Sequence, residues 1–138
     1  MKRKKLSKEA VAKKYGFKSG LEEKISNVLS EKKVNFGYEE DKIIYTIPES
    51  LHKYTPDFTI RKSENRIMYI ETKGRWVTAD RKKLKLVKEQ HPELDIRFVF
   101  SNSRNKINKS SKTTYADWCV KNGFKYADKV IPEEWFNE

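Results

Sequence analysis

The sequence contains few of the residues that build disulfide frameworks or thiolate metal sites. Its 138 residues include one cysteine, Cys119, and two histidines, His52 and His91. One cysteine permits no internal disulfide and argues against an oxidising compartment, and neither histidine has a His or Cys partner at the spacing of a zinc site. We therefore expect Cys119 to be a half-buried helix residue and both histidines to be structural or exposed.

Long apolar runs and linkers are also absent. No uninterrupted apolar stretch approaches the roughly 18 to 20 residues that span a bilayer, and the Lys/Arg-rich start lacks the apolar segment of a signal peptide. We therefore expect no membrane association and a cytoplasmic location. With 4 prolines, 5 glycines and no Gly/Ser-rich linker, the chain is expected to form one domain, residues 18–138, behind a flexible basic arm, residues 1–17.

Positive charge, by contrast, is in excess. Lys and Arg number 31 against 20 Asp and Glu, and the formal net charge of +11 indicates a polyanionic partner. The excess lies in residues 1–18 and 75–113, at +7 each, whereas residues 19–74 sum to −1 and residues 114–138 to −2. Residues 19–74, the central segment, contain more carboxylates than basic side chains. Carboxylates repel phosphate, so a protein that binds DNA by charge alone gains nothing from them. A metal-dependent phosphodiesterase uses carboxylates to hold cations against the phosphate.

Hydrophobic periodicity predicts an α/β domain with a central mixed β-sheet flanked by helices. Ser19 is a suitable N-cap for the first helix, and Thr113 or Thr114 is expected to cap a later helix that stops at Asn122-Gly123. The predicted helices span residues 19–33, 78–91 and 114–121, with one last helical turn at 132–136. The predicted strands span residues 34–40, 42–47, 55–61, 66–73 and 95–100, and residues 47–54 and 101–112 are expected to be polar connections.

Four residues of the central segment stand out for their chemistry: Glu22, Asp57, Glu71 and Lys73. Asp57 lies in one predicted strand, and Glu71 and Lys73 lie two apart in the next, so these two side chains share one face of a predicted hairpin. Two carboxylates with a backbone carbonyl and waters suit the octahedral oxygen shell of Mg²⁺. Lys73 would then orient or activate the attacking water, or neutralise transition-state charge. The competing interpretation is a turn residue at Asp57 and a weak surface ion pair between Glu71 and Lys73.

The spacing of these residues resembles a known nuclease pattern. Pro56-Asp57, thirteen intervening residues and Glu71-Thr72-Lys73 look like the PD-(D/E)xK nuclease signature. Longer segments, in the same order, resemble phage endonuclease I, a family of enzymes that resolve four-way DNA junctions. These segments are FKSGLE (17–22), YTPDF (54–58), ETKG (71–74), DRKK (80–83), EQHPELDI (89–96) and ADKVIP (127–132).

The resemblance implies a restriction-endonuclease-like core and assigns a role to each residue of the pattern. Asp57 is similar to the aspartate that bridges two metal ions, Glu71 and the Thr72 carbonyl to ligands of the first ion, and Glu22 to the glutamate associated with the second. Lys73 is similar to the catalytic lysine. The implied cofactor is Mg²⁺, two ions per site, with Mn²⁺ as a substitute. Taken alone, Glu22 is better explained as a capping-box residue of the first helix, and it can fill both roles.

The resemblance also implies an activity and an assembly. The expected enzyme is a structure-selective, Mg²⁺-dependent DNA endonuclease that hydrolyses phosphodiester bonds at four-way (Holliday) junctions and other branched double-stranded DNA, in the cytoplasm of a bacterial host. The expected assembly is an intertwined, domain-swapped homodimer with a β-bridge crossover near residues 47–54. In that dimer Glu22 of one chain completes a site whose Asp57, Glu71 and Lys73 come from the other.

Basic residues near the second predicted helix are candidate DNA contacts. Arg81, Lys82 and Lys83 lie in its first turn, where the helix dipole disfavours cations, and phosphate contact is one reason to tolerate them there. Arg75 is a further candidate, and Trp76 is expected either to pack over the site or to touch DNA. Weaker candidates extend the same basic block: Arg104, Lys106, Lys109 and Lys112. The competing interpretation is a solvated helix face.

Three functional hypotheses follow from the sequence. The first is the junction-resolving endonuclease, and the second is a repair or transposition nuclease of the same superfamily with another DNA substrate. The third is a non-catalytic DNA-binding protein that uses its basic arm and helix.

Overall fold

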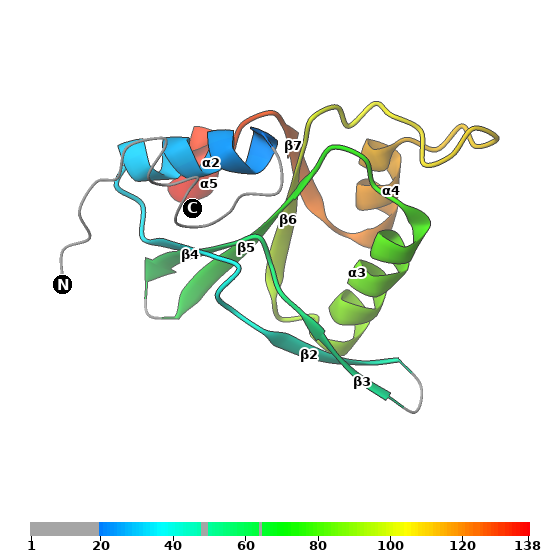
Figure 1. Ribbon diagram of the computed structural model, residues 1–138, viewed down its shortest axis with the longest axis horizontal. Helices are drawn as coiled ribbons and strands as arrows, with labels where there is room; N and C mark the ends of the chain where they lie inside the picture. Colours follow the sequence, from blue (N-terminus) through cyan, green and yellow to red (C-terminus); the bar gives the residue numbers. More distant parts are fainter. Residues whose placement is uncertain (1–19, 48–49, 64) are drawn as a thin grey trace.

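The computed structural model describes residues 20–47, 50–63 and 65–138, and at its centre lies a five-stranded mixed sheet (Figure 1). The strand order is β1-β4-β5-β6-β7. β4 pairs antiparallel with both β1 and β5, whereas β5, β6 and β7 run parallel to one another. The bounds are Phe36–Tyr38 for β1, Phe58–Ser63 for β4, Arg66–Lys73 for β5, Asp95–Phe100 for β6 and Lys125–Asp128 for β7. The predicted central mixed sheet is therefore confirmed.

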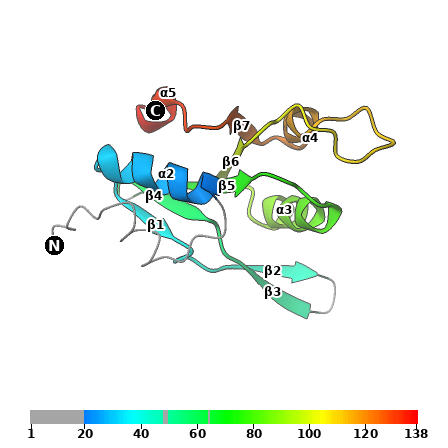
Figure 2. The ribbon, with the colours of Figure 1, turned by 45° about the horizontal axis from the view of Figure 1, so that its top comes forward.

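Helices cover both faces of this sheet (Figures 1 and 2). α2 (Gly20–Glu31) and α5 (Glu133–Phe136) lie on one face, and α3 (Thr78–Gln90) and α4 (Tyr115–Asn122) lie on the other. Successive strand side chains point to opposite faces, so each central strand supplies both cores. In β5, Met68 and Ile70 pack in the core beneath α2, while Tyr69 packs in the core on the α3 side.

Local sequence signals determine several element ends. Thr114 is the N-cap of α4: its hydroxyl accepts from the Asp117 backbone N–H, and the Asp117 carboxylate accepts from the Thr114 N–H, at 3.1 Å each. Gly123, with φ of 78°, ends this helix in the left-handed conformation. Both signals are confirmed. The expected N-cap Ser19 and the basic arm, residues 1–17, lie outside the described residues.

Residues 47–54 contain a strand rather than the expected polar connection. β3 (Ser50–Tyr54) pairs antiparallel with β2 (Ile43–Ile47) in a separate two-stranded sheet. The expectation is wrong because the polar composition conceals an alternation, in which Leu51 and Lys53 are exposed while His52 and Tyr54 face the protein. β7 is likewise not evident from the sequence, since it is a short, mostly exposed strand that pairs with β6.

Helix α3 holds the β2–β3 hairpin against the domain. The Gln90 side chain accepts from the Thr46 N–H and donates to the Thr46 carbonyl, at 2.6 Å in each case. The adjacent His91 ring contacts the Ile44 carbonyl at 2.6 Å. Two side chains of one helix end thus satisfy backbone groups along the outer edge of β2, which a two-stranded sheet would leave unpaired.

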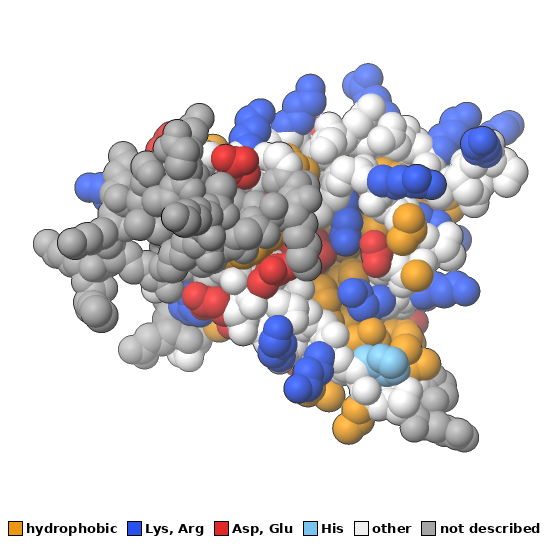
Figure 3. Space-filling model, in the orientation of Figure 1, with side chains coloured by type: hydrophobic (Ala, Val, Ile, Leu, Met, Phe, Trp, Pro, Cys, Tyr) orange, Lys and Arg blue, Asp and Glu red, His pale blue; other side chains and the backbone are white. Residues whose placement is uncertain are grey.

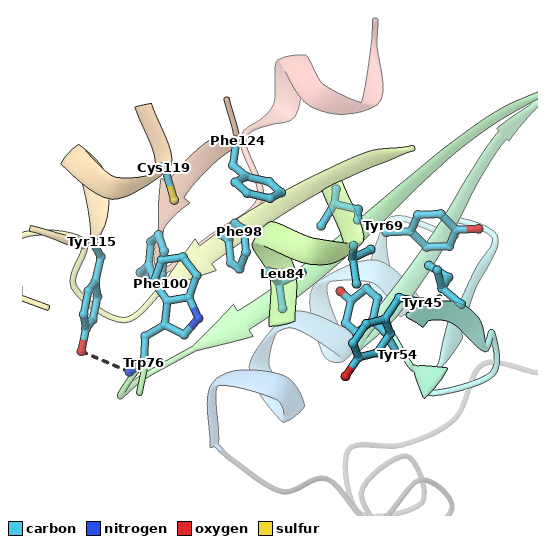
Figure 4. Close-up of a cluster of buried hydrophobic side chains, with 13 residues drawn as sticks. Tyr45, Tyr54, Tyr69, Trp76, Leu84, Phe98, Phe100, Tyr115, Cys119 and Phe124 are labelled. Carbon is cyan, nitrogen blue, oxygen red and sulfur yellow. Dashed lines mark hydrogen bonds between the residues drawn. The ribbon is translucent and has the colours of Figure 1, made fainter. Parts of the chain in front are cut away.

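Aromatic side chains dominate the core on the α3 side (Figure 4). Trp76 is 1% exposed, and its ring lies 4.6 Å from that of Phe98 and 4.7 Å from that of Trp118. Of its two expected roles, packing is therefore the one observed. Cys119 is fully buried in this core, more deeply than expected. No helix among residues 20–47, 50–63 and 65–138 has the length and apolar character to cross a membrane.

Candidate active site

Strand pairing brings the acidic residues of the central segment together at one end of the sheet. Tyr38 at the end of β1 lies opposite Phe58 at the start of β4, and Phe58 lies opposite Ile70 near the end of β5. The residues just beyond these pairs are Glu39, Asp57 and Glu71. They are 18 and 14 positions apart in the sequence, yet the antiparallel register makes them neighbours.

Asp57 is held by its neighbouring strand. Its Oδ2 accepts from the Thr72 backbone N–H at 2.8 Å and from the Thr72 hydroxyl at 3.0 Å. Its own N–H donates to Glu71 Oε1 at 3.1 Å. Burial raises the pKa of the Asp57 carboxyl, and the bonds from Thr72 and the charge of Lys73 oppose that rise. The predicted proximity of Asp57 and Glu71 is thus observed, although Asp57 lies just before β4 rather than inside a strand.

Glu71 is almost completely buried. Only 3% of the residue is exposed, and its Oε1 accepts from the Tyr54 hydroxyl at 2.7 Å in addition to the Asp57 N–H. Burial, with the negative charge of Asp57 second, raises the pKa of Glu71 from 4.5 to about 8, against the opposing effect of Lys73. The ionised form is therefore destabilised in the metal-free protein, and a bound cation would relieve that cost.

Lys73 lies between two carboxylates. Its Nζ lies 3.7 Å from Glu71 Oε2. It also lies 3.4 Å from Oδ2 of Asp80, a residue in the first turn of α3. Burial lowers the pKa of Lys73, but Glu71, Asp80 and Asp57 together outweigh it, and the net pKa is raised. Lys73 therefore carries its charge at neutral pH. Asp80 was not a candidate on sequence grounds, although it opens the DRKK segment that carries the resemblance.

A second set of carboxylates forms a possible cation site. One oxygen each from Glu22, Glu39 and Asp57 lies within 4.8 Å of the others. Glu22 is 6% exposed, and one of its carboxylate oxygens accepts from the Tyr38 hydroxyl. In Figure 3, acidic side chains gather near the middle of the face shown, with Lys and Arg side chains beside them. The sequence predicted Glu22 and Asp57 but not Glu39, whose only signal is its place in the acidic run directly after β1.

These residues fit a hard divalent cation. The donors are all carboxylate oxygens, which Mg²⁺ prefers, and three of them converge. Asp57 is common to this set and to the pair with Glu71, so it lies between Glu22 on one side and Glu71 on the other. Within the described residues, the Glu71 carboxylate is turned toward Tyr54 and Lys73 rather than toward Glu22.

The candidate DNA contacts divide into exposed and buried residues. Arg75 and Lys82 are exposed, and Lys83 is half-buried with its Nζ 5.6 Å from the centre of the Tyr54 ring. Arg81 departs from the expectation of a surface contact, because it is only 5% exposed. Its guanidinium donates to the Trp76 carbonyl at 2.5 Å and to the Thr78 hydroxyl at 3.0 Å, so it holds the turn that leads into α3.

Comparison with known proteins shows which family this chain belongs to. A profile of the phage endonuclease I family matches residues 3–138, which is nearly the whole chain. The chain belongs to the phage endonuclease I family. The match includes every residue of the candidate site, so the resemblance of the separate segments extends through the residues between them.

Two curated relatives of this family member are very similar to it. Endonuclease I of Escherichia phage T7 is 53% identical over 122 residues, which cover 88% of this chain and 79% of the relative. Endodeoxyribonuclease 1 of Enterobacteria phage T3 is 54% identical over 116 residues, which cover 84% of this chain and 74% of the relative. The family membership identified from the sequence segments is therefore confirmed.

Proposed function

We propose that this member of the phage endonuclease I family is a structure-selective, Mg²⁺-dependent endonuclease that hydrolyses phosphodiester bonds at four-way (Holliday) junctions and other branched DNA. That the chain is a deoxyribonuclease follows from its family and from its two named relatives. The observation that carries the metal-dependent mechanism is the convergence of Glu22, Glu39 and Asp57 beside Lys73.

We assign the cation ligands from this arrangement. Asp57 would be the shared ligand, Glu71 and the Thr72 carbonyl would hold one ion, and Glu22, joined by Glu39, would hold the other. Two Mg²⁺ ions, for which Mn²⁺ would substitute, would supply positive charge against the attacking and leaving oxygens of an in-line displacement. The two hydrogen bonds from Thr72 hold the Asp57 carboxylate in place before any ion binds.

Lys73 contributes charge rather than a free amine. Because its pKa is raised by Glu71, Asp80 and Asp57 despite its burial, Nζ is an ammonium group that donates hydrogen bonds at neutral pH. Such a group stabilises negative charge that develops on the phosphate, and it can orient the attacking water without accepting its proton. Of the roles expected for Lys73, charge neutralisation and orientation therefore have the stronger support.

Basic side chains near the start of α3 would contact the phosphates of the DNA. Lys82, Lys83 and Arg75 lie on or next to the start of α3, the helix whose first turn also carries Asp80. Phosphates held there would pass close to Lys73. We propose that the loop cations and the basic arm, residues 1–17, extend this contact; the loop residues are Arg104, Lys106, Lys109 and Lys112.

The homodimer is part of the proposal. In the single chain, Glu22 already meets its own Asp57, and the β2–β3 hairpin separates them in sequence. If that hairpin opened into a crossover, the same contacts would form between the two chains of a swapped dimer. A mixture of Glu22→Ala chains and Lys73→Ala chains tests this, because a swapped heterodimer retains one intact site. No recovery of nicking would refute the exchange.

Cleavage assays test the proposed activity. We expect a four-way junction to be cut in preference to a linear duplex of the same sequence, with Mg²⁺ and not with EDTA. Asp57→Asn should reduce cleavage by at least about 100-fold while junction binding is retained. Equal cleavage of both DNAs would favour a different substrate within the superfamily, and normal cleavage by Asp57→Asn would refute the assigned site.

A further inference from the structure

Tyr54 connects the β2–β3 hairpin to the candidate active site. It is the last residue of β3 and lies opposite Ile43 in the hairpin register. Its ring is 1% exposed, and its hydroxyl donates to Glu71 Oε1 at 2.7 Å. A side chain of the hairpin therefore reaches through the core to a carboxylate of β5, although the hairpin is not part of the main sheet.

This hydrogen bond restrains one of the two carboxylate oxygens of Glu71, Oε1. Oε1 accepts from both the Tyr54 hydroxyl and the Asp57 N–H, whereas Oε2 faces Lys73 Nζ at 3.7 Å. A carboxylate with two donors on one oxygen and a cation near the other has little freedom to rotate. Without the hydroxyl, only the backbone N–H of Asp57 would hold Oε1, and the carboxylate could swing toward Lys73.

The ring of Tyr54 is itself firmly held. It belongs to the aromatic core on the α3 side, where Figure 4 shows it beside Tyr45 at one end of the cluster, away from Trp76 and Phe100 at the other end. The ammonium group of Lys83, on α3, lies 5.6 Å from the ring centre. The ring therefore lies inside the packed core, with the Lys83 ammonium group over it.

We propose that Tyr54 is a positioning residue: its hydroxyl fixes the Glu71 carboxylate in the orientation that the cation site needs, and so makes that site depend on the place of the end of β3. This inference rests on the proposed metal-dependent function. Partners of a metal-binding side chain typically change metal affinity or activity by about 10- to 100-fold when they are removed. A displacement of the end of β3 from β5 would withdraw the hydroxyl and weaken cation binding.

The test compares two variants that each remove one hydroxyl from the same core. Tyr54→Phe removes the donor to Glu71, and Tyr69→Phe removes a hydroxyl that is hydrogen-bonded to Asp41 instead. Mn²⁺ binding to the DNA-free protein is measured by calorimetry and by the EPR signal of the free ion. We expect Tyr54→Phe to bind Mn²⁺ about 10-fold more weakly and Tyr69→Phe to bind it like the wild type.

A double variant shows whether the effect passes through Glu71. In a Glu71→Gln background, Tyr54→Phe should cause no further loss of Mn²⁺ affinity, because coupled residues are not additive. An unchanged affinity in Tyr54→Phe, an equal loss in Tyr69→Phe, or a further loss in the double variant would each overturn the inference. Absence of Mn²⁺ binding by the wild-type protein would instead refute the metal site, and with it the proposed function on which the inference rests.

Discussion

Replacing Glu71 by glutamine should stabilise the metal-free protein at pH 8 while it removes nuclease activity. Glu71 is buried, and burial together with the charge of Asp57 raises its pKa from 4.5 to about 8. In the unfolded chain the Glu71 carboxyl ionises near pH 4.5. Above that pH, the folded protein must therefore either bind a proton at Glu71 or bury an unfavourable negative charge there. The stability that the protonated form contributes is complete below pH 4.5 and is lost as the pH rises through about 8.

The size of this effect follows from the interval between the two pKa values. Each pH unit corresponds to about 1.4 kcal/mol for one proton, so the full interval is worth on the order of 5 kcal/mol. Glutamine keeps the shape of the side chain, and its amide oxygen can accept from Tyr54 and from the Asp57 N–H. It carries no charge, so the wild-type protein should lose stability between pH 5 and 8, and Glu71→Gln should lose much less.

Urea unfolding of the metal-free protein at several pH values measures this directly. Glu89→Gln is a suitable control, because Glu89 is an exposed glutamate on α3. We expect the control to follow the wild-type curve and Mg²⁺ to restore wild-type stability at pH 8 by binding the native state. If the wild-type free energy of unfolding did not fall between pH 5 and 8, or if Glu71→Gln fell as steeply, the account of the Glu71 environment would be wrong.

Four further predictions concern the site, the basic surface and the C-terminal residue. Asp80→Asn should reduce cleavage by about 10-fold or more without weakening Mn²⁺ binding, since Asp80 contacts Lys73 and not the proposed cation ligands; an equal loss of Mn²⁺ affinity would contradict this. Arg81→Met should lower the free energy of unfolding by about 1 to 3 kcal/mol, because it leaves a buried carbonyl without its donor. Lys82→Met should leave stability unchanged and reduce the salt dependence of junction binding. A loss of stability in Lys82→Met, together with a reduced salt dependence in Arg81→Met, would refute a structural role for Arg81 and a DNA contact by Lys82. Hydrogen bonds from basic side chains, that from Arg97 first, lower the pKa of Glu138 to about 2. Glu138 should therefore stabilise the protein above pH 4.5 and lose that effect as the pH falls toward 2. Acid unfolding of Glu138→Gln that matches the wild-type curve would contradict this.

The positions of most elements could be read from local sequence. β5 at Arg66–Lys73 and β6 at Asp95–Phe100 lie where apolar and β-branched residues predicted them, and α3 ends one residue before the prediction. Their signals are local: hydrophobic periodicity, a proline after His91 and capping residues at each end of α4. The segments that carry the family resemblance also contain the four residues predicted for the site, Glu22, Asp57, Glu71 and Lys73, and their role in catalysis stays a prediction.

Only the tertiary structure revealed which groups these residues contact. Glu39 joins Glu22 and Asp57 because β1 and β4 pair in one particular register, and Arg81 turns inward because a carbonyl and a hydroxyl lie within its reach. Neither outcome follows from residue type, since the same glutamate and arginine would be surface residues in another register or turn. Residue types and local patterns predicted the strands at Arg66–Lys73 and Asp95–Phe100, and they are the basis of the chemistry proposed for the site. Folding decided the partners and the pKa values of those groups, because distance and burial depend on residues far away in the chain.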